Sequence, residues 1–408
     1  MRGAEAVLAC LREQDVDTVF GYPGGMILPL YDALYGQTEI RQILVTHEQN
    51  AAHAADGYAR ATGRVGVCIA TSGPGATNLV TGIATAYMDS IPMVAITGQV
   101  DLEMLGRDAF QETDILDVTM PVTKHNYKVK NAADLVPTIR EAFDLARSGR
   151  PGPVLIDVPR NLFFEEVAYT AQKLVEHQPG KPDADFIICA AEAAAEIVNA
   201  ERPLVIVGGG VISAGASAET VAFIEKYQLP VVHTLMGMGA VPSTHPQMLG
   251  FIGMHGAKAA NYAVGAADLV IALGSRFADR LTGNLSKFTA NRRFIHIDID
   301  PAEIDKIVGS SIGLAGDMRV VLNLLMRKEP KRDHTAWWQQ IHTWQEEFED
   351  DYHVNSLTVP WALHQVTRMT AGKAYAYVTD VGQHQMWAAL HLRVEEPRTW
   401  LTSGGLGT

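Results

Sequence analysis

Short apolar runs rich in β-branched residues alternate with helical patterns along this chain, and this alternation limits the possible folds more than any other feature. A strand followed by a helix and another strand forms a βαβ unit, which places the strands parallel in one sheet. Two series of such runs are present, at 18–21, 43–45, 65–71, 93–97 and 154–158, and at 204–207, 231–235, 269–273 and 294–299. We therefore expect an α/β protein with consecutive doubly wound parallel-sheet domains.

Three domains are expected from this pattern. Residues 1–165 form the first, residues 190–328 form the second, and residues 355–408 begin a third with only two strand signals. Two strands do not bury a core by themselves. We therefore expect the third domain to be incomplete and the chain to be truncated at its C-terminus.

Charge and cysteine content narrow the classes of function. The net charge is -13 and no run of Lys or Arg is present, which argues against a general nucleic-acid or membrane-surface binder. Cys10, Cys68 and Cys189 are far apart, so neither a disulfide framework nor a zinc site is indicated, and a reducing cytoplasm is expected. The N-terminus does not resemble a signal peptide, and no apolar run reaches the roughly 20 residues of a membrane span.

Several common catalytic motifs are excluded. His47 and Glu48 begin like the zinc-protease motif H-E-x-x-H, but position 51 is Ala. The segment SGPGATN (72–78) follows an expected strand as a phosphate loop would, yet it lacks the Lys-Ser/Thr of a P-loop. An anionic ligand would have to be held by backbone amides, a few Arg side chains or a metal.

Glu48 is the most informative single residue. An acid at the start of a helix is commonly placed there by the helix dipole. Here, however, Ala51, Ala52, Ala54 and Ala55 would leave the carboxylate poorly hydrated, with room for a flat ligand. Such an acid tends to hold its proton and can share it with a ring nitrogen. These residues alone leave both interpretations open.

A set of uncommon strings resembles the acetolactate synthase (acetohydroxyacid synthase) catalytic subunits, which depend on thiamine diphosphate. The similarity covers essentially the whole chain, in order and spacing. The strings are FGYPGG (20–25), HEQ (47–49), ATSGPGATN (70–78), ITGQV (96–100), DAFQE (108–112), GRPGPVLIDVP (149–159), GMHG (253–256), HIDIDPAEI (296–304) and TDVGQHQMWAA (379–389).

The resemblance implies roles for individual residues. Glu48 would hydrogen-bond the aminopyrimidine ring of thiamine diphosphate and assist removal of the thiazolium C2 proton, with Phe110 and Gln111 beside the reacting carbonyls. Further cofactor contacts would be Tyr22, Pro23, Thr71, Pro74 and Asn78 at the pyrimidine and Gly382, Gln383 and His384 at the diphosphate. The family's Mg²⁺ ligands would lie beyond Thr408, so no metal ligand is expected in this chain. The chain alone is expected to bind the cofactor weakly and turn over little or not at all.

The second domain resembles the family's FAD-binding domain, in which the flavin has no net redox role. The expected contacts are Arg150, Arg160, Gly208, Gly209, Thr234, Leu235, Met254, His255, Gly274, Arg276, Arg280, Asp298, Ile299, Gly316 and Asp317. Two positions depart from the family pattern. Ala278 replaces a carboxylate next to the flavin ring, and Arg160 replaces a Lys.

The resemblance implies an acetolactate synthase, a transferase of branched-chain amino acid biosynthesis that decarboxylates pyruvate and joins the remainder to pyruvate or 2-oxobutanoate. A homodimer or homotetramer and a small regulatory subunit are the expected partners. Two alternatives stay open. One is another thiamine diphosphate enzyme of the pyruvate oxidase group, and the other is a truncated, non-catalytic nucleotide-binding or interaction remnant.

Overall fold

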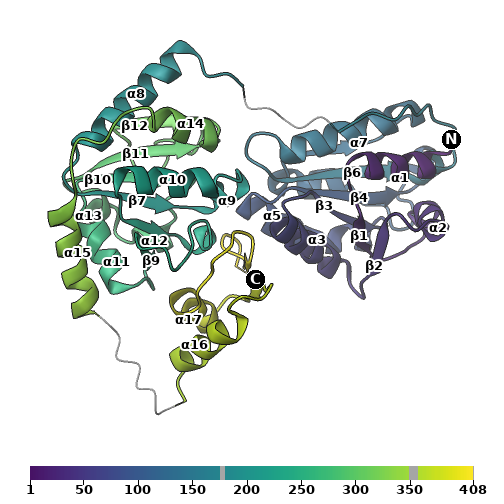
Figure 1. The fold of residues 1–408 in the computed structure, drawn as a ribbon. Coiled ribbons are helices and arrows are strands. Elements are labelled where there is room, and N and C mark those ends of the chain that lie inside the picture. Colours follow the sequence, from purple (N-terminus) through teal and green to yellow (C-terminus); the bar gives the residue numbers. More distant parts are fainter. Residues whose placement is uncertain (175–179, 349–356, 408) are drawn as a thin grey trace. The chain divides into compact units, whose positions relative to one another are not determined.

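The computed structural model describes residues 1–174, 180–348 and 357–407 (Figure 1). The chain divides into two compact units, one of Met1–His177 with Ser403–Thr408 and one of Gln178–Thr402. Residues 355, 356 and 408 of the expected third domain lie outside the described residues. The boundaries 1–165, 190–328 and 355–408 therefore stay predictions.

The first unit contains a six-stranded sheet in the order β2-β1-β3-β4-β6-β5, and all of its strand pairs are parallel. The strands are β1 (Thr18–Gly21), β2 (Arg41–Leu44), β3 (Gly66–Ala70), β4 (Met93–Gln99), β5 (His125–Lys128) and β6 (Pro153–Pro159). The helices are α1 (Gly3–Glu13), α2 (Leu28–Tyr35), α3 (Glu48–Thr62), α4 (Pro74–Asn78), α5 (Val80–Asp89), α6 (Ile115–Thr119) and α7 (Ala132–Arg147), with short 3-10 turns η1 (Leu102–Met104), η2 (Met120–Val122) and η3 (Arg160–Phe163).

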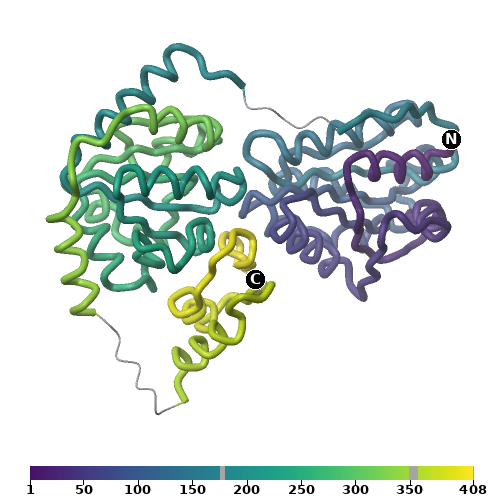
Figure 2. The backbone as a smooth tube through the Cα atoms, in the orientation of Figure 1, coloured from purple at the N-terminus to yellow at the C-terminus, as the bar shows by residue number. Residues whose placement is uncertain are grey.

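Helices cover both faces of this sheet because its strands bury side chains on both sides (Figure 2). In β3, Val67 and Ile69 pack into the core under α1, α2 and α7, whereas Cys68 and Ala70 pack into the core under α3 and α5. Successive side chains of a strand point to opposite faces, so a central strand buried on both faces is apolar throughout. The expected doubly wound arrangement is confirmed.

The second unit contains a six-stranded parallel sheet in the order β12-β11-β10-β7-β8-β9. Numbered from its own first strand, this is the order 3-2-1-4-5-6 of dinucleotide-binding sheets. The strands are β7 (Pro203–Val207), β8 (Val231–His233), β9 (Met248–Phe251), β10 (Leu269–Leu273), β11 (Arg293–Asp298) and β12 (Ile312–Ala315). The helical elements are α8 (Ala184–Asn199), α9 (Gly209–Ser213), α10 (Ser217–Tyr227), η4 (Leu235–Gly237), α11 (Lys258–Ala266), α12 (Asp279–Thr282), α13 (Leu285–Thr289), α14 (Met318–Leu325) and α15 (Thr335–Glu347).

The segment from residue 357 packs within the second unit. It forms α16 (Val359–Thr370), β13 (Tyr377–Val378), α17 (Gln383–His391) and β14 (Trp400–Leu401). β13 and β14 make only a two-stranded parallel sheet. Tyr377, Leu392 and Trp400 are buried in a cluster that also includes Met238 and Phe251. The short sheet therefore obtains its core from the neighbouring part of the unit.

Every strand expected from the sequence has a counterpart, with bounds that agree or differ by at most two residues. Strands β5, β9 and β12 were not predicted from the sequence, and each of them is an edge strand, which is short and only partly buried. Within the described residues, no helix is both long enough and apolar enough to cross a membrane.

Candidate functional site

The first candidate site lies at the carboxyl ends of β1, β2 and β3. In the sheet, β1 lies between β2 and β3, so the chain leaves β1 toward one side and returns with β3 on the other. Ligands of open α/β sheets bind in the crevice at such a switch point. Tyr22 and Pro23 follow β1, Glu48 follows β2, and Thr71 follows β3. The structure therefore brings the ends of three predicted segments to one edge of the sheet.

Glu48 is the first residue of α3 and only 8% exposed. The Nδ2 atom of Asn78 donates a hydrogen bond of 2.9 Å to its Oε2 atom. Among the residues that the structure describes, none donates a hydrogen bond to Oε1. Ala51 and Ala52 of the same helix are fully buried, and the low exposure of Glu48 agrees with the expected poorly hydrated carboxylate. One carboxylate oxygen is thus oriented by the protein and the other is left for a ligand.

The cap of α3 is provided by the preceding residue. His47 has extended backbone angles and its Nδ1 atom accepts a hydrogen bond from the Gln49 amide at 3.2 Å. The carboxylate of Glu48 has its hydrogen bond from a different helix, α4, through Asn78. Capping therefore does not explain why an acid occupies position 48.

Glycines keep the space around Glu48 narrow. A Cβ atom added to Gly75 would lie 2.8 Å from Thr71 Cγ2 and 3.3 Å from Glu48 Oε1. A Cβ atom on Gly24 would lie 2.5 Å from Thr71 Cγ2. The Met26 amide donates to the Thr71 hydroxyl at 3.2 Å, so the loop after β1 lies against the loop after β3. Only glycine lets the backbone at positions 24 and 75 lie this close to the Thr71 side chain.

The loop that includes Phe110 and Gln111 also reaches this site. Gly73 has φ +58°, and a Cβ atom there would lie 2.7 Å from the carbonyl oxygen of Gln111. Gln111 itself has φ +59°. The carboxylate of Glu112 accepts hydrogen bonds from the amides of Gly106 and Ala109 and so closes the loop on itself. The structure therefore brings Gln111 beside the Gly73 turn, while Phe110 is 81% exposed.

Ser72 directly follows Thr71 and was not predicted from the sequence as a site residue. Its side chain is buried, and its hydroxyl has no hydrogen-bond partner within the described residues. A buried polar atom normally has a partner. The signal for this residue was its place between a buried strand and a glycine turn. The open Oε1 atom of Glu48 and the glycine-lined space beside it fit a flat ligand with polar ring atoms.

Two predicted pyrimidine-end residues are more exposed than the rest. Tyr22 is 42% exposed, although its amide donates to the Ile69 carbonyl at 3.3 Å, and Pro74 is exposed at the first position of α4. Pro23 is half-buried. Gly382, Gln383 and His384 belong to the other unit, where they form the start of α17.

The second candidate site lies at the switch point between β7 and β10 of the second sheet. A Cβ atom on Gly208 would lie 2.1 Å from the Gly274 carbonyl oxygen, and one on Gly210 would lie 2.7 Å from Gly274 Cα. Gly274 has φ +57°, which favours glycine. Glycine turns of this kind let a phosphate-bearing ligand approach the backbone and a helix N-terminus.

The expected flavin residues of this unit all follow the carboxyl end of a strand of this sheet. They are Gly208 and Gly209 after β7, Thr234 and Leu235 after β8, Met254 and His255 after β9, Gly274, Arg276 and Arg280 after β10, Asp298 and Ile299 at the end of β11, and Gly316 and Asp317 after β12. The Gly316 amide donates to the Asp298 carbonyl at 2.8 Å. One edge of the sheet therefore holds the whole set.

Three expected flavin residues have other contacts or another location. Arg150 and Arg160 belong to the first unit, where Arg150 Nε donates to Ser90 Oγ at 2.8 Å and the Arg160 guanidinium lies over the Phe164 ring. Asp317 caps α14 by accepting from the amides of Arg319 and Val320. One of its oxygen atoms is thus already engaged.

His233 lies directly before Thr234 and is fully buried. Its Nδ1 atom faces the Thr234 carbonyl oxygen at 3.1 Å, and its ring stacks on Phe251. Burial lowers the pKa of His233 to about 4, and the hydrogen bond to the Thr234 carbonyl opposes this only in part. The ring is therefore neutral at neutral pH.

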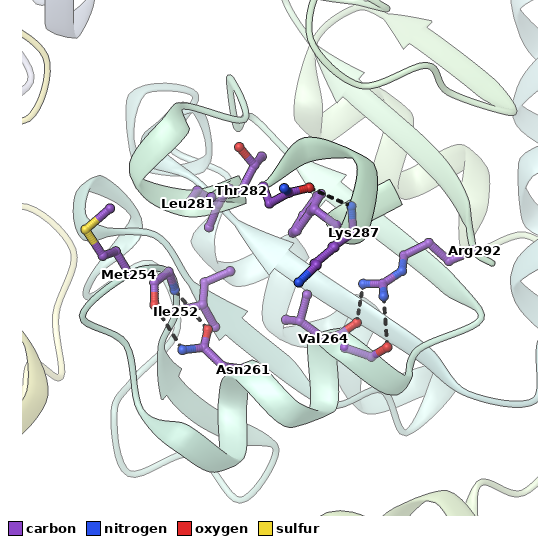
Figure 3. Close-up of a pocket in the computed structure, with 13 residues that line it drawn as sticks. Ile252, Met254, Asn261, Val264, Leu281, Thr282, Lys287 and Arg292 are labelled. Carbon is purple, nitrogen blue, oxygen red and sulfur yellow. Dashed lines mark hydrogen bonds between the residues drawn. The ribbon is translucent and has the colours of Figure 1, made fainter. Parts of the chain in front are cut away.

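A cavity of about 340 Å³ borders Met254 between α11, α12 and α13 (Figure 3). Most of the polar side chains that line this cavity form hydrogen bonds with backbone atoms. Asn261 exchanges two hydrogen bonds with Gly253, and Arg292 donates to the carbonyls of Val264 and Gly265 (Figure 3). Within the residues described, no group of three or more His, Cys, Asp or Glu side chains could hold a metal ion.

Three thiamine pyrophosphate enzyme families match the chain. The N-terminal TPP binding domain matches residues 1–118, the central domain matches residues 190–325, and the C-terminal TPP binding domain matches residues 380–408. The first match includes Glu48, Asn78 and Gln111, and the second includes the glycine turns of the β7–β10 switch point.

Full-length matches to relatives agree with these families. The acetolactate synthase large subunit of Corynebacterium glutamicum is 47% identical over all of this chain and 66% of its own length. That of Parasynechococcus marenigrum is 48% identical over 67% of its length, and the isozyme 3 large subunit of Escherichia coli is 44% identical over 73%. The chain thus spans about two thirds of the length of these relatives.

Proposed function

The chain belongs to the acetolactate synthase large-subunit family of thiamine pyrophosphate enzymes, and on this premise we propose that it takes part in the decarboxylation of pyruvate and the joining of the remainder to a second 2-oxo acid. Pyruvate and 2-oxobutanoate are the proposed substrates, and branched-chain amino acid biosynthesis is the proposed pathway. The observation that best supports this is the buried Glu48 carboxylate, with one oxygen held by Asn78 and one left open.

The fit of the site supports thiamine diphosphate as the ligand. When bound, thiamine diphosphate supplies a carbon nucleophile and accepts the electron pair released with carbon dioxide. Glu48 would hold a proton at Oε1 toward a ring nitrogen, and Asn78 would keep the carboxylate in one orientation. Thr71 and the glycines on either side of Pro74 would admit a flat ring and exclude water.

Gln111 and Phe110 are the proposed substrate-side residues. Gln111 lies beside the Gly73 turn, and the exposed Phe110 is available to cover an apolar part of the substrate. Tyr22, Pro23 and Pro74 would contribute the rest of the wall at the pyrimidine end. Gly382, Gln383 and His384 would bind the diphosphate through the start of α17.

FAD and Mg²⁺ complete the proposed cofactors. The strand order of the second sheet and the close packing of Gly208, Gly210 and Gly274 support a dinucleotide in that unit. Mg²⁺ would neutralise the diphosphate of the first cofactor. These relatives are large subunits, which supports a smaller partner protein. A homodimer or homotetramer and a cytoplasmic location remain part of the proposal.

The test uses a polypeptide in which residues 1–408 are followed by the part of the Corynebacterium glutamicum relative that continues beyond the matched region. We call this the extended polypeptide. It is supplied with pyruvate, thiamine diphosphate, Mg²⁺ and FAD, and acetolactate is measured. Acetolactate is the expected product. Acetyl phosphate and peroxide would instead favour the pyruvate oxidase group, and flavin binding without release of carbon dioxide would favour a non-catalytic module.

A further inference from the structure

An ionisable side chain outside the proposed cofactor contacts is fully buried in the first sheet. Asp157 lies in β6, opposite Thr97 of β4, and has no exposed surface. Thr97 Oγ1 donates to its Oδ1 atom at 2.7 Å, and Gln99 Nε2 donates to its Oδ2 atom at 3.0 Å. Burial raises the pKa of Asp157 to about 6 against the effect of these hydrogen bonds. A buried acid costs stability, so a role other than packing is indicated.

Gln99 connects this acid to the loop beside the cofactor site. Its Nε2 atom also donates to the Thr113 carbonyl at 3.0 Å, and its Oε1 atom accepts from the Val100 amide at 2.8 Å. A carboxylate and a carbonyl only accept hydrogen bonds, and an amide N–H only donates. The orientation of the Gln99 amide group is therefore determined by all three neighbours.

Thr113 follows Phe110 and Gln111 in the loop between β4 and α6. The beginning of this loop is held by a second contact, since the Leu102 amide donates to Asn161 Oδ1 at 3.1 Å. The Gln111 carbonyl lies against Gly73, with no room for a Cβ atom between them. The position of Thr113 at the end of this loop therefore determines where Gln111 contacts the turn at Gly73.

We propose that Asp157 is a positioning residue that, through the side-chain amide of Gln99, fixes the Thr113 carbonyl and so holds Gln111 and Phe110 beside the Gly73 turn. The effect of Asp157 on catalysis rests on the proposed function, whereas its effect on the order of loop residues 101–114 does not. Asp157 has no exposed surface and Gln99 is only 1% exposed, so neither side chain touches the substrate or the cofactor.

Amide hydrogen exchange of the 408-residue chain without cofactor tests the positioning itself. Asp157→Leu removes the acceptor for Gln99, and Gln99→Leu removes the link to Thr113. Each is expected to speed exchange in residues 101–114 by about tenfold, the equivalent of one lost hydrogen bond. Exchange in β3 provides the internal reference.

Two matched variants separate positioning from core stability. Thr97→Val removes the other hydrogen bond of the same carboxylate and leaves Gln99 in place. Asp157→Asn retains an acceptor for Gln99, because its amino group can face the Thr97 hydroxyl. Both are expected to leave exchange in residues 101–114 within about twofold of the unmodified chain.

If Thr97→Val and Gln99→Leu speed amide exchange in residues 101–114 equally, the proposal is wrong, because exchange in the loop would then depend only on the stability of the core. Unchanged exchange in Gln99→Leu would also overturn it, even if Asp157→Leu fails to fold. In the extended polypeptide, Gln99→Leu is expected to raise the KM for pyruvate by about tenfold while kcat changes less. An inactive extended polypeptide would contradict the proposed function and leave the exchange result intact.

Discussion

The side-chain amide of Asn78 donates a hydrogen bond of 2.9 Å to Glu48, from the last residue of α4 to the first residue of α3. These two helices follow different strands, β3 and β2, so the contact exists only after the sheet has formed. It orients a buried carboxylate and leaves its Oε1 atom without a donor among the described residues. The proposed chemistry depends on this arrangement.

Replacing Asn78 by Ala removes the donor that orients Glu48. We expect thiamine diphosphate to bind the extended polypeptide about tenfold to 100-fold more weakly, because a hydrogen bond to a charged group contributes about 1.5–3 kcal/mol. Titration calorimetry measures the affinity. Thr77→Ala changes an exposed residue next to Asn78 on the same helix, and this variant should bind thiamine diphosphate with unchanged affinity. Equal affinities for both variants would show that the Asn78 contact does not matter.

Adding one methyl group at position 75 tests the narrow space beside Glu48. In Gly75→Ala the new Cβ atom would lie 2.8 Å from Thr71 Cγ2, so Thr71 or Glu48 must move. We expect cofactor affinity to fall by more than about tenfold. Gly57→Ala in α3 is the matched control, because nothing lies within 4 Å of its added Cβ atom.

Gly57→Ala should bind the cofactor normally and raise stability slightly, by about 0.5–1 kcal/mol, because alanine favours a helix. Calorimetry and thermal unfolding of both variants provide the comparison. If Gly75→Ala retained full affinity, the site described here would not be the pyrimidine site.

The sequence predicts the central strands of both sheets because they are buried on both faces and read as continuous apolar runs. It does not predict β5, whose residues HNYK are polar and partly exposed, nor β9 and β12. Edge strands depend on pairing with a neighbour that is distant in the sequence, and local patterns do not reveal such pairing.

Only some residues of the candidate site and its surroundings could be predicted, for a similar reason. Glu48 was identified from its alanine-rich surroundings and the resemblance, and its burial is confirmed. Gln99 and Asp157 lie in strings that were recognised, yet their contact joins β4 to β6 and ends at Thr113. An acid inside an apolar strand was the available signal, but its partners appear only in three dimensions.

Restoring a carboxylate at position 278 should strengthen flavin binding. Ala278 is exposed at the start of α12, so an Asp side chain is accommodated there. The resemblance implies a carboxylate near the flavin ring at this position, and a hydrogen bond to a charged acceptor contributes enough for about tenfold tighter binding. FAD fluorescence quenching measures the affinity of Ala278→Asp. Ala290→Asp adds the same charge elsewhere on the surface, and an equal gain there would indicate a general charge effect.

Acid should destabilise the second unit through His233. Its pKa is lowered from 6.5 to about 4 in the folded protein, so the unfolded chain binds the proton more tightly. The stability that the neutral ring contributes is present above about pH 6.5 and is lost as the pH falls toward 4. From about pH 7 to about pH 5, we expect a loss of about 2 kcal/mol.

Urea unfolding of the chain and of His233→Phe at both pH values measures this loss. The Phe variant retains an aromatic ring beside Phe251 but has no group that titrates. It should be less stable at neutral pH and should lose less stability in acid. Identical pH dependence of the two proteins would mean that His233 does not titrate as described.

The most direct test of the account is acetolactate formation by Glu48→Gln in the extended polypeptide. Glutamine retains the shape of the side chain but cannot hold and return a proton at Oε1, so the rate should fall at least about 100-fold. Glu219→Gln, which changes an acid in the first turn of α10, should leave the rate within about twofold. A Glu48→Gln rate equal to that of the unmodified extended polypeptide would contradict the proposed role of Glu48.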